Sequence, residues 1–345
     1  MKLATGAGYW SSGPPAGALE AIKEAEKMGF DSFWTAEAYG SDALTPLAWW
    51  GSHTDTIKLG TGIIQMSART PTATAMAALT LDHLSGGRFI CGLGVSGPQV
   101  VEGWYGQPYP KPLARTREYI DIMRQVFARQ APVAADGEFY QLPFKGGMGI
   151  GKALKPTVHP LRSDIPIYLA AEGPKNVALA GELCEGWLPL FFSPDDDSFY
   201  RSALQAGFDA AGKGTFGSPD APDFDVVCPV TVVPMDDIEK AANLVRPMLA
   251  LYMGGMGAKG ANFHHEVFCR MGHEDVANRV QELYLAGKKE EAAAAIPVSV
   301  VEKVSLIGPV DKIRDDLAQW EESVVTTMMV SGPPQVMRLM AELCL

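Results

Sequence analysis

The sequence predicts an α/β fold, a (β/α)8 TIM barrel with insertions, on the basis of three observations. Short runs rich in β-branched and aromatic residues alternate with helical segments from the first residue almost to the last. Two such runs, residues 57–64 and 167–171, are apolar on both faces, as in parallel strands with helices on one side and a filled core on the other. A chain of 345 residues suits one barrel with insertions, so we expect a single domain over residues 1–345.

The first half of the chain predicts four strand–helix units. We expect strands at residues 2–9, 30–36, 57–64 and 88–94. We expect helices at residues 16–28, 44–53, 72–84 and about 115–129. In the first helix Leu19, Ile22 and Ala25 form one apolar stripe, and Gly29 supplies the helix stop.

The second half repeats the scheme with two interruptions. We expect strands at residues 166–171, 186–192, 225–233 and 324–330. Helices are expected at residues 174–183, 194–211, 310–320 and 334–343, with a further helical stretch after residue 233. Residues 131–164 and 252–299, both with glycine-rich segments, do not fit a bare barrel. We expect them to be insertions, which in barrels tend to be lids or interfaces.

The composition indicates a soluble globular protein and argues against several classes of partner. A formal net charge of −11 and the lack of a lysine and arginine cluster oppose binding to nucleic acid. No apolar run approaches the roughly 18 residues that a membrane span requires. The first residues lead directly into a strand without the apolar core of a signal peptide, so we expect a cytoplasmic protein.

The cysteines and histidines do not predict a metal or redox centre. The five cysteines are far apart and form no C-x-x-C pair, so we expect buried thiols. The six histidines, including the pair His264-His265, have no metal-ligand spacing such as H-E-x-x-H, so we expect no metal. The sequence also lacks the G-x-S-x-G nucleophile turn of serine hydrolases.

The fourth strand leads into a G-x-G-x-x-G motif, Gly92-Leu93-Gly94-Val95-Ser96-Gly97. A dinucleotide-binding fold requires a helix that opens at the third glycine, whereas here Pro98 and an aromatic, proline-rich stretch up to Pro112 predict a delayed helix. We therefore expect a loop at the top of a barrel, where glycine lets the main chain approach a flat cofactor. A simple tight turn stays open.

The fifth strand leads into the start of a helix at Gly173, Pro174, Lys175 and Asn176. Proline at the first helical position is a good start signal, and we expect the amides of Lys175 and Asn176 to point out of the helix. Free amides at the positive end of a helix bind phosphate. The alternative is an ordinary helix start without a ligand.

Two further groups of candidate site residues follow the second and third strands. Glu37 and Asp42 offer carboxylates for proton transfer, although Asp42 could instead cap the next helix and Glu37 could pair with Arg69. Gly62 lies between β-branched residues, which in a central strand usually marks a bulge or a close approach of main chains. Gly62 and Gln65 are therefore candidates, with a packing role for Gly62 as the alternative.

Several motifs together resemble the luciferase-like monooxygenase superfamily, and more specifically its actinobacterial branch of F420-dependent oxidoreductases. The similarity extends over nearly the whole chain. The motifs that carry it are Leu59-Gly60-Thr61-Gly62-Ile63, Leu84-Ser85-Gly86-Gly87-Arg88-Phe89, Gly92-Leu93-Gly94, Ser96-Gly97-Pro98-Gln99, Ala170-Ala171-Glu172-Gly173-Pro174 and Leu306-Ile307-Gly308-Pro309. The Ser-Gly-Gly-Arg and Gly-x-Gly motifs are diagnostic of the superfamily but separate F420 users from flavin users only weakly.

The resemblance implies a bacterial-luciferase-like barrel that binds the deazaflavin coenzyme F420, with FMN as the alternative cofactor. It implies a non-prolyl cis peptide bond between Gly62 and Ile63, at a bulge against the cofactor ring. The residues that it implies around the ring are Gln65, Val95, Ser96 and Gly97, and those around the cofactor phosphate are Gly173, Pro174, Lys175 and Asn176. Relatives are commonly dimers, so the resemblance also implies a homodimer.

One departure from the family pattern bears on the reaction. F420 relatives that oxidise alcohols or sugar phosphates carry Asp-His at the end of strand two, where this chain has Glu37-Ala38. The resemblance therefore implies a reductase that transfers a hydride to an activated C=C or C=O bond of a small organic substrate, with Glu37 or water as the proton donor. The alternatives are an FMN-dependent monooxygenase and a non-catalytic cofactor-binding protein.

Overall fold

Eight parallel strands close into a barrel in the computed structural model, which describes residues 1–345 apart from the side chain of Ser331. Neighbouring strands pair in the order β1, β2, β3, β5, β8, β9, β10, β12, and β12 pairs with β1 to close the ring. The predicted barrel is confirmed. The strands are β1 (Lys2–Ala7), β2 (Ser32–Thr35), β3 (Lys58–Thr61), β5 (Phe89–Gly94), β8 (Ile167–Ala170), β9 (Gly186–Leu188), β10 (Asp225–Pro234) and β12 (Thr327–Ser331).

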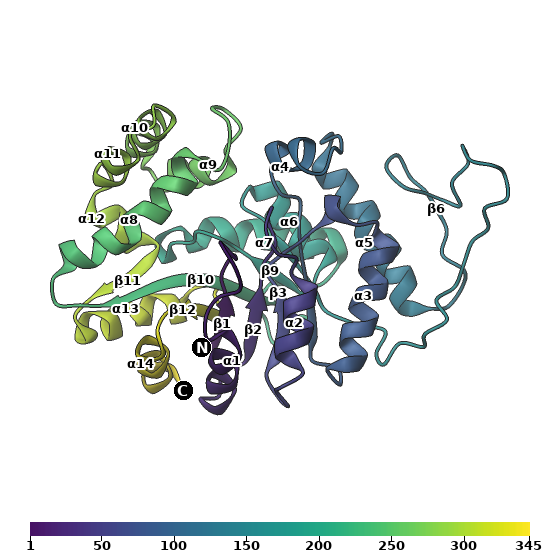
Figure 1. Cartoon of the computed structure of the whole chain (residues 1–345), viewed down its shortest axis with the longest axis horizontal. Helices are drawn as coiled ribbons and strands as arrows, with labels where there is room; N and C mark the ends of the chain where they lie inside the picture. The colour runs from purple at the N-terminus through teal and green to yellow at the C-terminus, as the bar shows by residue number, and fades with distance from the viewer.

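Helices surround this barrel (Figure 1). In the first of them the predicted stripe is confirmed, since Ile22 and Ala25 are fully buried and Leu19 is half-buried. The surrounding helices are α1 (Ala18–Lys27), α2 (Leu44–Gly51), α3 (Pro71–Leu84), α5 (Pro112–Ala128), α6 (Pro174–Leu183), α7 (Asp197–Ala211), α8 (Ile238–Gly254), α13 (Val310–Glu322) and α14 (Pro334–Cys344).

The barrel interior is a small apolar core, separate from the large core between strands and helices. Trp34 on β2 and Tyr168 on β8 fill much of it, with ring centroids 5.9 Å apart. A Cβ atom on Gly60 would lie 2.4 Å from the Trp34 indole, so β3 approaches β2 only because residue 60 is glycine. Because side chains fill the interior, a ligand can bind only at the rim of the barrel.

Three elements differ from the sequence-based expectation. The strand expected at residues 57–64 is divided at Gly62-Ile63 into β3 and β4 (Ile64–Gln65). A short strand that we did not predict, β11 (Ser305–Gly308), pairs with the last residues of β10 outside the ring. The expectation of a delayed helix was wrong, because α4 (Pro98–Gly103) begins directly after Gly97, where proline occupies the first helical position.

The two predicted insertions lie on opposite sides of the barrel (Figure 1). Residues 131–164 are mostly irregular and contain the antiparallel strands β6 (Ala135–Asp136) and β7 (Gln141–Leu142). Residues 252–299 are mostly helical and pack against α8 on a second apolar core that includes Leu249, Phe268 and Val280. Their helices are α9 (Phe263–Arg270), α10 (Glu274–Leu285), α11 (Lys289–Ala294) and the start of α12 (Val298–Lys303).

Throughout the part of the chain that the structure describes, no helix is both long and apolar enough to cross a membrane. The division of residues 1–345 into one domain stays a prediction.

The Arg88 side chain of the Ser-Gly-Gly-Arg motif is structural and lies at the amino-terminal end of the barrel strands. Its guanidinium donates to the main-chain oxygens of Ile57 at 2.6 Å and Thr54 at 3.0 Å. It also donates to the Thr54 hydroxyl at 3.1 Å, to the Gly51 carbonyl at 3.3 Å and to the Ser85 carbonyl at 2.8 Å. One side chain thus joins the end of α2, the start of β3 and the start of β5.

Replacement of Arg88 by lysine is expected to lower the free energy of unfolding by about 2 kcal/mol, because one ammonium group cannot satisfy five acceptors spread around a planar guanidinium. Urea denaturation measures the change. Arg314→Lys is the matched control, since Arg314 is exposed and pairs only with exposed Asp311 among the described residues. Equal stability of the two variants would contradict the structural role.

Candidate functional site

The predicted site residues gather at the carboxyl-terminal rim of the barrel. Gly62, Ile63 and Gln65 lie at the end of β3 and in β4, and Val95, Ser96 and Gly97 follow β5. The residues from Gly173 to Asn176 follow β8, which pairs with β5. Three adjacent strands therefore bring all of these residues to one edge, where barrel enzymes place their ligands.

The chain between β3 and β4 forms the predicted bulge. The Gly62–Ile63 peptide bond is cis, as the family resemblance implied. The Gly62 amide donates to the Thr35 carbonyl at 2.7 Å, and pairing with β5 resumes at Ile64 and Gln65. The Ile63 side chain packs against β5, where a Cβ atom on Gly94 would lie 2.8 Å from its Cδ1.

The first glycine of the G-x-G-x-x-G motif is needed for packing between strands. A Cβ atom on Gly92 would lie 1.7 Å from the main-chain oxygen of Thr61. The Thr61 hydroxyl accepts from the Gly92 amide at 2.9 Å and donates to the Gly92 carbonyl at 3.0 Å. Glycine is thus required at positions 92 and 94 because neighbouring protein atoms occupy the space of a side chain. We had expected glycine there to let a cofactor approach the main chain.

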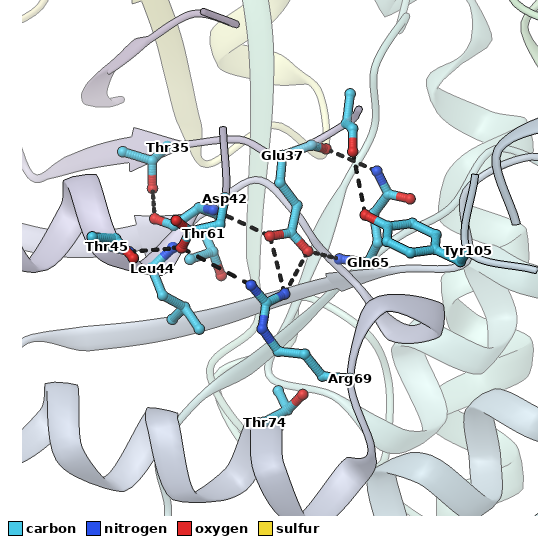
Figure 2. A network of polar contacts seen from close by, with 12 residues as sticks. Thr35, Glu37, Asp42, Leu44, Thr45, Thr61, Gln65, Arg69, Thr74 and Tyr105 are labelled. Carbon is cyan, nitrogen blue, oxygen red and sulfur yellow. Dashed lines mark hydrogen bonds and ion pairs between the residues drawn. The ribbon is translucent and has the colours of Figure 1, made fainter. Parts of the chain in front are cut away.

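Glu37 is the centre of a buried polar network (Figure 2). Only 5% of Glu37 is exposed. Its Oε1 accepts from the Gln65 amide at 2.8 Å and from Arg69 Nη1 at 2.7 Å, and its Oε2 accepts from the Ala43 amide at 3.1 Å and from the same Nη1 at 3.0 Å. Both oxygens are thus held by donors, as expected of an ionised carboxylate.

The contacts of Glu37 and Asp42 match the alternatives that the sequence left open. Glu37 pairs with Arg69, and Asp42 Oδ1 accepts from the amides of Leu44 and Thr45 at 2.9 and 2.8 Å at the start of α2. Such a cap satisfies amides that have no partner within the helix. Catalysis by Glu37 stays a prediction.

The start of α6 is open on the side expected to face a ligand. A Cβ atom on Gly173 would have no neighbour within 4 Å, and Lys175 is exposed. The Asn176 amide does not point away from the helix as we expected, because it donates to the Gly173 carbonyl at 2.9 Å and closes the first turn.

Three buried acceptors at this rim have no protein partner among the described residues. They are Oε1 of Gln65, Oε2 of Glu172 and Oδ1 of Asn176. A buried polar atom without a hydrogen bond is costly in a finished fold, so such atoms indicate a ligand or water. Within the same described part of the chain, no three His, Cys, Asp or Glu side chains are placed to hold a metal ion.

An open groove beside this rim was not predicted from the sequence. It has a volume of about 820 Å³ and lies between the loops after β1 and β2 and the outer face of α2. Its walls include Trp10, Pro46, Trp49 and Trp50. The volume and the apolar walls suit a small organic molecule. The signal in the sequence was that four of the seven tryptophans lie within the first 50 residues, and three of these four line the groove.

The comparisons with known proteins agree with this geometry. Residues 3–327 match the family described as luciferase-like monooxygenase. The chain belongs to this family. This luciferase-like protein is 56% identical, over 334 residues, to a Mycobacterium tuberculosis protein provisionally named a coenzyme F420-dependent oxidoreductase, covering 96% of this chain and 95% of the relative. The predicted family is thereby confirmed.

Two further similarities concern archaeal proteins. A 5,10-methylenetetrahydromethanopterin reductase of Archaeoglobus fulgidus is 31% identical over 320 residues, which cover 90% of this luciferase-like chain and 88% of the relative. The solved structure of a coenzyme F420-dependent tetrahydromethanopterin reductase from Methanopyrus kandleri has a TM-score of 0.77 at 24% identity, covering 99% of this chain and 97% of that one. This structural similarity supports the fold alone.

Replacement of Gly92 by alanine is expected to separate β3 from β5 and to lower the free energy of unfolding by about 3 kcal/mol, because the new methyl group meets main-chain atoms that cannot turn away. Thermal and urea denaturation measure the loss. Gly103→Ala is the matched control, since a Cβ atom there would have nothing within 4 Å. A Gly92→Ala protein as stable as the control would contradict this account of the motif.

Proposed function

We propose that this protein is an F420-dependent oxidoreductase that transfers a hydride between the deazaflavin and a small organic substrate. The observation that carries the proposal is the 56% identity, over almost the whole chain, to a relative named for that activity. The rim geometry supports it, because the unpartnered acceptors lie where the family resemblance expects the cofactor.

The residues present fit a planar, phosphorylated cofactor. Gln65 Oε1 can accept a hydrogen bond from an N–H group at the edge of the cofactor ring. Asn176 Oδ1 can accept one from a hydroxyl group in the side chain of the cofactor. Val95, Ser96 and Gly97 are available to contact the ring. Gly173, Pro174 and Lys175 leave the helix start open to a phosphate, which the helix dipole and the lysine attract.

When bound, the reduced deazaflavin supplies a hydride from its ring carbon C5. The chain itself orients the reactants and excludes water from them. We propose that the substrate is a small or medium apolar molecule with an activated C=C or C=O bond, which the tryptophans of the groove are suited to contact. The Glu37-Ala38 sequence supports reduction because no histidine base follows β2 directly.

We also propose a cytoplasmic homodimer. The five cysteines are free thiols, which is usual in reducing compartments. The helices α2 and α3 contact each other and expose the large apolar side chains Trp49, Met76 and Leu84, which is typical of a surface that pairs with another protein.

Equilibrium titration with F420, FMN and NADPH is expected to show binding of F420 at least about tenfold tighter than of the other two, which corresponds to about 1.4 kcal/mol. Cofactor fluorescence measures each dissociation constant. Purified protein that binds FMN and consumes oxygen would instead establish a flavin-dependent monooxygenase. Tight F420 binding without turnover of any acceptor would favour the non-catalytic cofactor-binding alternative.

Replacement of Glu37 by glutamine separates the two possible roles of this side chain. If Glu37 positions the bulge, loss of its charge weakens the bonds from Arg69 and the Gln65 amide, so the dissociation constant for F420 is expected to rise about tenfold. If Glu37 donates the proton, kcat falls while F420 affinity is unchanged. Glu24→Gln is the control, because Glu24 is a surface carboxylate on α1 paired with Lys27.

A further inference from the structure

The side chains of His264 and Glu172 form a pair at the barrel mouth that the cofactor site does not explain. Glu172 follows β8, and His264 belongs to α9 in the helical insertion. His264 Nδ1 lies 2.5 Å from Glu172 Oε1, although 92 positions separate the two residues in the chain. Arg270, at the other end of α9, donates to the Glu172 carbonyl at 2.8 Å. The insertion is therefore held against the end of β8 at two points.

Asn262 fixes His264 in this position. Its Oδ1 accepts from the amides of His264 and His265 at 3.0 and 3.2 Å and so caps α9. Its Nδ2 donates to the carbonyls of Tyr252 and Met253 at 2.8 and 3.0 Å, which ties the cap to the end of α8. Asn262 is buried, with 4% of it exposed, so this cap fixes the start of α9 against the end of α8.

Aromatic rings enclose the imidazole. The Tyr252 ring meets it edge to face with centroids 4.8 Å apart, and the Phe191 ring does so at 6.1 Å. Burial raises the pKa of the Tyr252 phenol, and neighbouring Tyr9 raises it further, so this hydroxyl stays protonated. The orientation of the imidazole is thus set by Glu172 and by two rings.

This arrangement leaves one nitrogen of His264 for a ligand. Nδ1 is engaged by Glu172, whereas Nε2 has no partner within the described part of the chain, and 22% of the side chain is exposed. A carboxylate on Nδ1 fixes the tautomer of a neutral imidazole and stabilises its protonated form. Nε2 is thus available for proton transfer to or from a ligand.

We propose that His264 is the acid–base residue of the barrel mouth, with Glu172 as its positioning residue, for a carbonyl or enone substrate. The proposal rests on the proposed function, which supplies the hydride. The hydride forms a C–H bond with the carbon at one end of the substrate's polarised double bond, and the π bond of that double bond breaks. The proton on His264 Nε2 then passes to the atom at the other end. His264 is left neutral and regains a proton from water.

The other charged or titratable groups around this pair are one arginine and four tyrosines. Arg270 on α9 donates to the Glu172 carbonyl, and Tyr252 on α8 packs against the imidazole. Tyr200 on α7 lies near Glu172 and Arg270, whereas Tyr9 and Tyr39 lie beside Tyr252. Burial raises the pKa of Tyr252 and of Tyr200, so both phenols stay protonated. The acidic side chain that contacts the imidazole Nδ1 is that of Glu172.

The first test uses the cofactor-free protein labelled with ¹⁵N in the histidine rings. NMR is expected to show that the His264 ring, assigned as the one missing in His264→Asn, is held in the tautomer with its proton on Nδ1, facing the Glu172 carboxylate. Glu172→Ala is expected to release this tautomer, because the acceptor of the Nδ1 proton is removed. A His264 ring that carries its proton on Nε2, or a tautomer that Glu172→Ala leaves unchanged, overturns the proposal.

The second test adds F420 and menadione, a quinone that accepts one hydride and one proton. In His264→Asn the amide can still donate to Glu172, but Nε2 is lost, so F420 affinity is expected to persist while kcat for menadione falls about 100-fold at unchanged KM. His83→Asn, at an exposed histidine on α3, is the control. Wild-type protein that binds F420 but reduces no menadione, or an unchanged kcat in His264→Asn, overturns the inference. Wild-type protein that does not bind F420 overturns the proposed function instead, while the NMR result stands by itself.

Discussion

The buried carboxylate of Glu37 is the interaction on which the geometry of the rim depends. It lies directly after β2, yet it accepts from the Gln65 amide beyond the bulge, from Arg69 before α3 and from the Ala43 amide at the start of α2. A carboxylate with so little access to water is stable only when donors surround it, so these segments hold one another in place. The Glu37 carboxylate therefore fixes the main-chain segments that form the site. Such a site suits a ligand that is recognised through its shape and a few hydrogen bonds.

The helical insertion adds a second, independent wall to this rim. Its core is separate from that of the barrel and includes Leu249, Phe268 and Val280, so it is a packed layer and not a loose loop. Contact with the barrel is made through polar groups at Glu172 and through aromatic rings. Chemistry proposed for the mouth can therefore draw on groups from two layers: main-chain and amide groups from the barrel, and an imidazole from the insertion.

The sequence predicted the barrel well because each strand–helix unit carries local signals. The helix at residues 174–183 was predicted with the correct bounds, since Pro174 starts it and the apolar pattern ends at residue 183. The helix after Gly97 was missed because aromatic and proline residues beyond it were given more weight than the start signal at Pro98. The pairing of Glu37 with Arg69 was foreseen as an alternative, whereas the contact between Glu172 and His264 depends on how an insertion folds back over the barrel, which has no local signal in the sequence.

The two motifs that are diagnostic of the superfamily contribute Arg88 and Gly92, whose contacts are with other parts of the protein. Arg88, in a motif that helps to identify the superfamily, joins α2, β3 and β5 at the amino-terminal end through five main-chain and hydroxyl acceptors. Gly92 serves the packing of β5 on β3. Neither residue is positioned to distinguish a deazaflavin from a flavin, because Arg88 lies at the opposite end of the barrel and Gly92 packs against Thr61. Selection between these rings must arise from the groups that reach the mouth, such as Gln65 and the loop that begins at Val95, so motifs that define the fold carry little information about the cofactor.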